Sequence, residues 1–169
     1  VICDTLEGNI EGIPETEPRG VYGGDDDCDN SGVLRFVSIR HGGSEIGAAN
    51  EINGLTMGGV GAGTRISHVE VFMNLDDGFE WFGGSVAVDH LVAAFVGDDA
   101  FDYDECWHTA PLASCDNVRR GHQYLFAIHG TTGGDRSGEH DGGYGSDVGA
   151  CPVTTPLFSN VTYIGKGTE

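Results

Sequence analysis

The chain has 169 residues, 38% of them hydrophobic, which is the size of one ordinary domain that can bury its own core. It carries 27 Asp and Glu residues against 8 Lys and Arg, for a formal net charge of −19 at pH 7. This charge argues against nucleic acid as a partner. No run of about 18 apolar residues occurs, so we expect no membrane span.

The cysteines point to an oxidising compartment. They have neither the CxxC spacing of a metal site nor the CxxCH of haem attachment, so we expect disulfides. The chain begins at Val1, as expected of a mature protein whose signal segment has been removed. We therefore expect an extracellular or cell-surface protein. The five cysteines are Cys3, Cys28, Cys106, Cys115 and Cys151.

Residues 1–31 differ from the rest of the chain. Their prolines, glycines and acidic run leave little room for an internal strand, and we interpret them as an extended N-terminal arm or cap. Asp25, Asp27 and Asp29 have the i, i+2, i+4 spacing of a calcium loop, but the glycine and glutamate that complete such a loop are missing. They are a weak second candidate for a metal site.

From Gly32 onward, short segments of alternating hydrophobic and polar residues are separated by glycine pairs, and no helix is predicted. Residues 66–81 recur 22 residues later as 88–103 without a gap. An earlier copy of the second half lies at 53–57, and further strands are predicted at 123–129 and 158–164. Repeats of this length predict an all-β fold, a right-handed parallel β-helix of about five coils over residues 32–169.

Stacking the repeats predicts which side chains meet. Alternation along the strands directs Glu80 and Asp102 outward. An insert at 106–115 interrupts the repeat and contains Pro111, so we expect a local disulfide between Cys106 and Cys115 to hold it. The core pairs expected are Phe79 with Phe101, Trp81 with Tyr103 and Val69 with Leu91.

Several motifs occur in order: Asn53-Gly54-Leu55-Thr56-Met57-Gly58-Gly59-Val60-Gly61, Asp76-Asp77-Gly78-Phe79-Glu80-Trp81-Phe82-Gly83-Gly84 and Gly97-Asp98-Asp99-Ala100-Phe101-Asp102. Together they resemble a family of secreted bacterial β-helix proteins, over roughly residues 32–165. The resemblance implies the fold and export. It implies no catalytic residue.

The aspartates of the two repeats should form pairs of like charge, because equivalent residues in stacked coils lie about 4.8 Å apart. Each pair costs roughly 1 kcal/mol in water, and no Lys or Arg lies between Ile66 and Val118. We therefore expect calcium, which prefers carboxylate and carbonyl oxygens. Solvated, salt-screened turns are the alternative. The predicted calcium ligands are Asp76, Asp77, Asp98, Asp99 and Asp102.

Histidines offer a different kind of site. His68 and His90 share a repeat position and are expected to stack, and His140 lies between two acidic residues. A histidine metal site or general base is conceivable, although turn histidines are more often structural. Asn160 begins a glycosylation sequon, but the strand predicted around it argues against its use.

Two functions remain open. The first is a structural module of a cell surface, filament or matrix, which joins copies of itself or other surface components and uses the arm as a cap or exchange segment. An odd number of cysteines leaves at least one for another molecule. The second is a polysaccharide lyase or glycosidase with Glu80 and Asp102 as its carboxylate pair. Against it, the acidic surface lacks the basic residue that a lyase needs and would repel an acidic polysaccharide.

Overall fold

A computed structural model describes residues 7–47, 50, 52–108, 124–129, 136–140, 154 and 156–165. Within these ranges the regular structure is almost entirely β-strand, with one short 3-10 turn, Pro18–Gly20, and no helix long and apolar enough to cross a membrane. The strands are β1 (Glu7–Asn9), β2 (Val21–Gly23), β3 (Val33–Arg40), β4 (Leu55–Gly58), β5 (Arg65–Phe72), β6 (Phe79–Phe82), β7 (Val88–Ala94), β8 (Phe101–Asp104), β9 (Leu125–Ile128), β10 (Glu139–His140) and β11 (Val161–Ile164).

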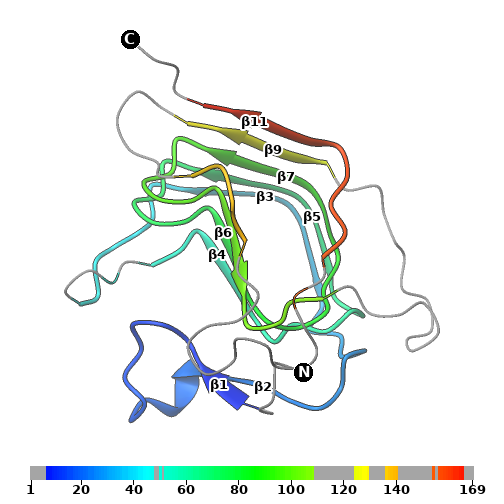
Figure 1. Ribbon diagram of the computed structural model, residues 1–169. Helices are drawn as coiled ribbons and strands as arrows, with labels where there is room; N and C mark the ends of the chain where they lie inside the picture. Colours follow the sequence, from blue (N-terminus) through cyan, green and yellow to red (C-terminus); the bar gives the residue numbers. More distant parts are fainter. Residues whose placement is uncertain are drawn as a thin grey trace.

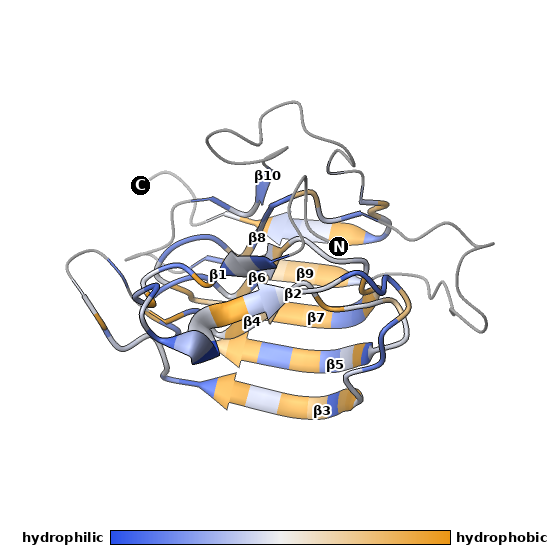
Figure 2. Ribbon diagram, turned by 90° about the horizontal axis from the view of Figure 1, so that it is seen from below, coloured by the Kyte–Doolittle hydropathy of each residue, from blue (hydrophilic) through white to orange (hydrophobic). Residues whose placement is uncertain are grey.

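Two parallel sheets build the body of the molecule. One has five strands in the order β11-β9-β7-β5-β3, and the other has four in the order β10-β8-β6-β4. Consecutive strands therefore alternate between the sheets, and each sheet pairs every second strand with the next. Figure 1 shows the chain winding in stacked coils, and Figure 2 shows β3, β5, β7 and β9 side by side in that order. The fold is a parallel β-helix, as the repeat predicts.

The 22-residue repeat sets the register of the central coils. Val69 pairs with Leu91, Phe79 with Phe101 and Trp81 with Tyr103. The earlier copy also pairs as predicted, because Leu55 of β4 lies beside Phe79 of β6. The strands predicted near 123–129 and 158–164 are β9 and β11. These predictions from the sequence are confirmed.

The core lies between the two sheets and is filled by the inward side chains of successive coils. The rings of Phe79 and Phe101 stack with centroids 5.5 Å apart, and Trp81 is fully buried. Trp81 stacks on Trp107, at 4.7 Å, and Trp107 in turn contacts Tyr103 at 5.3 Å. The start of the predicted insert therefore contributes an aromatic ring to the core.

The strands of the five-stranded sheet bend at a column of residues with left-handed backbone. Phe36, His68, His90 and Asn160 have φ values of 56°, 55°, 51° and 54°. Each occupies the same position in its coil, just before the paired residues Val37, Val69, Leu91 and Val161. Side chains other than glycine seldom adopt this conformation. The conformation therefore recurs in four of the five strands of this sheet, and Tyr124, at the equivalent position beside Leu125, does not share it.

The N-terminal arm is not wholly extended. β1 and β2 pair antiparallel, with Gly8 opposite Tyr22, and form a small sheet of their own outside the two parallel sheets. Each strand has only three residues, but a further hydrogen bond from Ile10 N to Gly20 O closes the loop between them and extends the hairpin. The Tyr22 ring lies 5.9 Å from that of Phe82 on β6. The hairpin thus packs beside the four-stranded sheet, as both ribbon views show (Figures 1 and 2).

The end of the arm is fastened to the turns that follow β4. Asp27 O accepts from Ala62 N, and Asp29 O accepts from Gly63 N. A Cβ atom added to Gly61 would lie 2.6 Å from Asp29 N, so the arm approaches this backbone too closely for any side chain at that position. These contacts bring the acidic arm against the coils.

Candidate cation site in an acidic cavity

A cavity of about 190 Å³ opens where successive coils turn into the four-stranded sheet. Among the residues that the structure describes, its lining contains eight carboxylates and two amides, and no Lys, Arg, His or Cys. The residues come from the arm, from the loop before β4, from the turns before β6 and β8, from these two strands themselves and from β10. They are Glu11, Asn50, Asn53, Asp76, Asp77, Glu80, Asp98, Asp99, Asp102 and Glu139.

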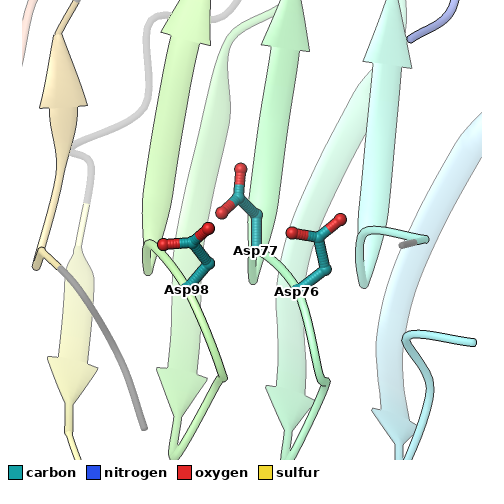
Figure 3. Close-up of side chains that lie close together, drawn as sticks. All are labelled: Asp76, Asp77 and Asp98. Carbon is teal, nitrogen blue, oxygen red and sulfur yellow. The ribbon is translucent and has the colours of Figure 1, made fainter. Parts of the chain in front are cut away.

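In the described part of the chain, two groups of three carboxylates could each hold a metal ion. In the first, Asp76, Asp77 and Asp98 bring one ligand oxygen each within 4.8 Å of the others. Figure 3 shows the side chain of Asp77 between those of Asp76 and Asp98. In the second group, Asp77 is joined by Glu80 and Asp102 at the same mutual distance. Asp77 therefore belongs to both groups.

Hydrogen bonds hold the buried carboxylates in place. Asp77 Oδ1 accepts from the backbone N–H of Asp99 at 2.9 Å, which ties the two coils together. Asp99 Oδ1 accepts from the backbone N–H of Arg136 at 2.6 Å, and the Arg136 guanidinium lies 3.4 Å from Asp99 Oδ2 and also contacts Glu139. Arg136 thus offsets part of the charge at the β10 side of the cavity.

Three of these groups have strongly raised pKa values. Burial raises the pKa of Asp77 to about 8 and that of Glu80 to about 10, with further contributions from neighbouring carboxylates. The pKa of Asp99 is raised to about 7, again mainly by burial. Ionising all three in the bare cavity is therefore costly, and either protons or a cation must offset their charge.

Glu80 corrects one expectation from the sequence. Alternation along β6 predicts that it points to solvent, but only 4% of it is exposed, and all four residues of β6 are buried. The covering groups come from distant parts of the chain: Asn53 donates its amide N–H to Glu80, and Glu11 of the arm lines the same cavity. Asp102, the equivalent residue one coil on, is half-buried.

The structure brings all five predicted calcium ligands together and adds residues that the sequence reasoning missed. Asn53 could have been found, because it occupies in the earlier repeat the position of Asp77, two residues before the paired Leu55 and Phe79. Glu139 pairs with Asp102 in the register, but its short strand has no recognisable repeat. Nothing in the sequence places Glu11 here.

The second predicted metal site is not assembled in the same way. Asp25, Asp27 and Asp29 do not form a group of three with ligand atoms in mutual reach, although all three lie in the described part of the chain. Asp27 Oδ2 lies 3.6 Å from His108 Nε2, while Asp29 Oδ2 accepts from Ser31 Oγ. Of the three carboxylates, that of Asp27 reaches the coils, whereas that of Asp29 makes a local contact.

Four further predicted residues have defined places. His68 and His90 stack nearly parallel with ring centroids 4.3 Å apart, as their shared repeat position predicts. The ring of His140 lies 4.8 Å from that of Tyr103. Asn160 is exposed, just before β11, and its glycosylation stays a prediction.

The predicted disulfide also stays a prediction. Cys106 is fully buried next to Trp107, whereas Cys115 lies outside the described residues.

The cavity fits a hard divalent cation. Its donors are carboxylate and amide oxygens, which calcium accepts in six to eight-fold irregular coordination. Zinc prefers histidine and cysteine ligands, and none of the described lining residues is a histidine or a cysteine. Asp76, Asp77 and Asp98 would hold a cation at the outer position, and Asp77, Glu80 and Asp102 at the inner one.

Stacked parallel coils with short glycine-rich turns and a lateral carboxylate cavity define the protein as a parallel β-helix with an acidic face. The chain belongs to the pectate-lyase-like β-helix domain family, whose model matches residues 8–169. Comparison with curated proteins and with solved structures returned no match.

Proposed function

We propose that this chain is a structural module of an extracellular β-helix protein, stabilised by calcium in the acidic cavity. The supporting observation is the burial of three carboxylates, Asp77, Glu80 and Asp99, among five others. An isolated buried carboxylate is unfavourable unless it is protonated or paired. A divalent cation bound at Asp77 would offset the negative charge of this carboxylate and of its neighbours in both groups.

Calcium titration of chelator-stripped protein tests this proposal. At a free concentration 100 times the Kd, one bound ion stabilises the fold by about 2.7 kcal/mol, which for a domain of this size raises the melting temperature by roughly 5–10 °C. Asp77→Asn removes the ligand shared by both groups and should abolish most of this shift. Glu45→Gln, on an exposed loop outside both candidate metal sites, is the control and should keep it. A wild-type melting temperature that moves by less than about a degree contradicts the proposal.

The same module is proposed to work by assembly at a cell surface, in a filament or in a matrix. Among the described residues β3 is the last strand of its sheet, so no described strand pairs with the backbone donors and acceptors of its outer edge. Val33 and Phe36 on this strand are 66% and 74% exposed. An exposed edge with apolar side chains favours addition of a strand from another molecule.

Light scattering after size exclusion, in calcium, measures assembly directly. We expect species larger than one chain, and deletion of residues 1–31 should change their size if the arm takes part. A single monomeric species in both proteins contradicts assembly without affecting the calcium proposal.

Catalysis is the second candidate, favoured by one observation. Glu80, with its raised pKa, is protonated near neutral pH in the bare cavity and lies beside Asp102, which resembles the acid and carboxylate of a glycosidase. Against it, the near-complete burial of Glu80 leaves no room for a sugar at that carboxyl group. Release of reducing ends or unsaturated products from neutral or acidic polysaccharides, lost in Glu80→Gln, would favour the enzyme.

A further inference from the structure

The inward side-chain ladders of the β-helix end in partly exposed residues at both ends of the five-stranded sheet. One ladder passes through Val69, Leu91 and Leu125, each at most 1% exposed. It continues to Val37 on β3 and Val161 on β11, which are only partly buried. Apolar surface at both ends therefore stays in contact with water, which is unfavourable. The other outermost members of such ladders are Leu34 and Ile39 on β3 and Phe158 and Tyr163 at the β11 end.

The two end strands have the same bend. Phe36 on β3 and Asn160 before β11 have φ values of 56° and 54°, and each comes just before the outermost residue of the ladder, Val37 or Val161. β5 has the bend and pairs with β3 and β7 on both sides of it. Among the described residues β9, which lacks it, pairs only over Leu125–Ile128. Residues other than glycine seldom adopt this backbone, so a strand of this chain matches the β3 edge better than an unrelated extended peptide.

Hydrogen bonds between coils form two series that run along the sheet. Leu125 N donates to Asn160 O at 3.3 Å, and His129 N donates to Ile164 O at 3.0 Å. The same two bonds occur between the coils of β7 and β9. Donors and acceptors are four residues apart on both end strands, so the two edges match. Continued by one coil, the series have donors at Val161 N and Gly165 N, and at the opposite end of the sheet acceptors at Phe36 O and Arg40 O.

The charges of the end strands also suit each other. β11 carries no charged residue, and β3 carries Arg35 and Arg40 but no acidic residue. The two edges therefore add no like-charge repulsion to that between the acidic molecules, whose net charge is −19. Two β3 edges brought together would instead place arginines of both copies side by side, which is unfavourable.

We propose that the β11 edge of one molecule adds to the β3 edge of a second copy of this chain, parallel and in register with the coils. This inference rests on the assembly in the proposed function and names its partner. Val161 of one copy would lie beside Val37 of the next, and Tyr163 beside Ile39, so the ladders would become continuous. The contact joins two different edges and does not close on itself, so copies add into a filament along the axis of the coils. With five strands about 4.8 Å apart, this filament repeats about every 24 Å. In Figure 2, β3 is the lowest strand of the stack.

Two lysine variants each block one edge. Val37→Lys and Val161→Lys place an ammonium group at opposite ends of the same ladder. In a single molecule the lysine can extend past the edge into water, whereas in the stack it would lie uncompensated between two coils. By sedimentation velocity, wild type is expected to associate with a Kd of about 0.1 mM or tighter, and each variant at least tenfold more weakly. Leu75→Lys, at an exposed turn outside both edges, is the control and should associate as wild type does.

Mixing the two blocked variants identifies the edges that meet. Val37→Lys keeps its β11 edge and Val161→Lys keeps its β3 edge, so an equimolar mixture should form a 1:1 dimer with the wild-type Kd. Circular dichroism and melting curves check that both variants are folded. Should either one unfold, the cysteine pairs described next decide alone.

Cysteine pairs test the register without changing the ladders. Ser38 and Thr162 are exposed and would lie opposite each other with Cα atoms about 4.8 Å apart, which suits a disulfide. Ser38→Cys/Thr162→Cys should form a series of covalent multimers on a non-reducing gel after oxidation. Ser38→Cys/Ile164→Cys, two residues out of register, is the matched control and should form at least tenfold fewer. Wild type on the same gel reports the contribution of the native cysteines.

The inference is overturned if either lysine variant, correctly folded, associates as wild type does, if their mixture stays monomeric, or if both cysteine pairs cross-link equally. When wild type is larger than one chain in these cases, assembly itself stands and uses another surface. A wild type that stays monomeric contradicts assembly and this contact together. The calcium titration is unaffected by any of these results.

Discussion

The buried carboxylates of the cavity carry either protons or a bound cation. Asp77 and Glu80, with pKa values of about 8 and about 10, are mostly protonated at neutral pH when no cation is present. A cation displaces those protons, because metal ligands bind in their ionised form. Calcium binding is therefore expected to release protons, and calorimetry in buffers of different ionisation enthalpy counts them.

Glu80→Gln separates the two states of this residue. Glutamine imitates the protonated acid and can still accept the Asn53 amide hydrogen bond. In chelator at pH 8 the variant should exceed wild type in stability by more than about 1 kcal/mol, because the cost of keeping Glu80 protonated is removed. In calcium it should lose part of the stabilisation. Urea unfolding measures both, and Glu45→Gln on an exposed loop is the control. Equal stability of Glu80→Gln and wild type in chelator would show that burial does not perturb this carboxyl group.

Trp81 is a large, fully buried side chain at the centre of the aromatic core, and we expect it to contribute strongly to the stability of the fold. It is fully buried and stacks on Trp107, so Trp81→Ala should lower the free energy of unfolding by about 3–5 kcal/mol. Leu75→Ala, at a side chain that is 68% exposed, should change it by less than about 0.5 kcal/mol. Chemical denaturation of the two variants in the same buffer gives the comparison. Similar losses for both would mean that the aromatic stack contributes little.

The sequence predicted the pairing of the strands, which depends on the 22-residue repeat. It did not predict the burial of residues that are covered by segments distant in the sequence. Phe79 and Phe101 could be paired because their surroundings are similar and 22 residues apart. The burial of Glu80 could not be predicted, because alternation describes one strand and not the arm and loop packed over it. The left-handed column was also missed, since Phe36, His68 and Asn160 share a backbone conformation but no side-chain chemistry.

A single methyl group added at Gly61 should disturb the packing of the arm against the coils. In Gly61→Ala the new Cβ would meet Asp29 N at 2.6 Å, so the arm must move away from the turn. The amides of Ala62 and Gly63, which donate to Asp27 O and Asp29 O, should then exchange hydrogen faster. Mass-spectrometric hydrogen exchange reports this. Gly47→Ala, whose new Cβ would have its nearest neighbour at 3.8 Å, should leave these amides unchanged. Unaltered exchange in Gly61→Ala would contradict the close approach.

For the whole molecule, the raised pKa values set the direction of its pH dependence. The folded state keeps protons on Asp77 and Glu80 that the unfolded chain releases near pH 4, so without a cation stability is full below about pH 4 and falls as the pH rises toward 8–10. Excess calcium should flatten this decline, because the ionised carboxylates are then its ligands. Unfolding free energies at pH 4, 6, 8 and 9, with chelator and with calcium, test both statements. Stability that rises with pH in chelator would contradict them.

The spacing of the paired strands also has a consequence for how the chain finds its structure. Central neighbours are 22 residues apart in sequence, as Val69 and Leu91 are, whereas the outer pairs Leu91 with Leu125 and Leu125 with Val161 are 34 and 36 apart. Loop closure alone favours the central pairs by only about 0.4 kcal/mol. The larger difference comes from the aromatic side chains that these coils bury. We expect folding to begin between β5 and β8 and to spread outward one coil at a time, with the fluorescence of Trp81 and Trp107 reporting the earliest step.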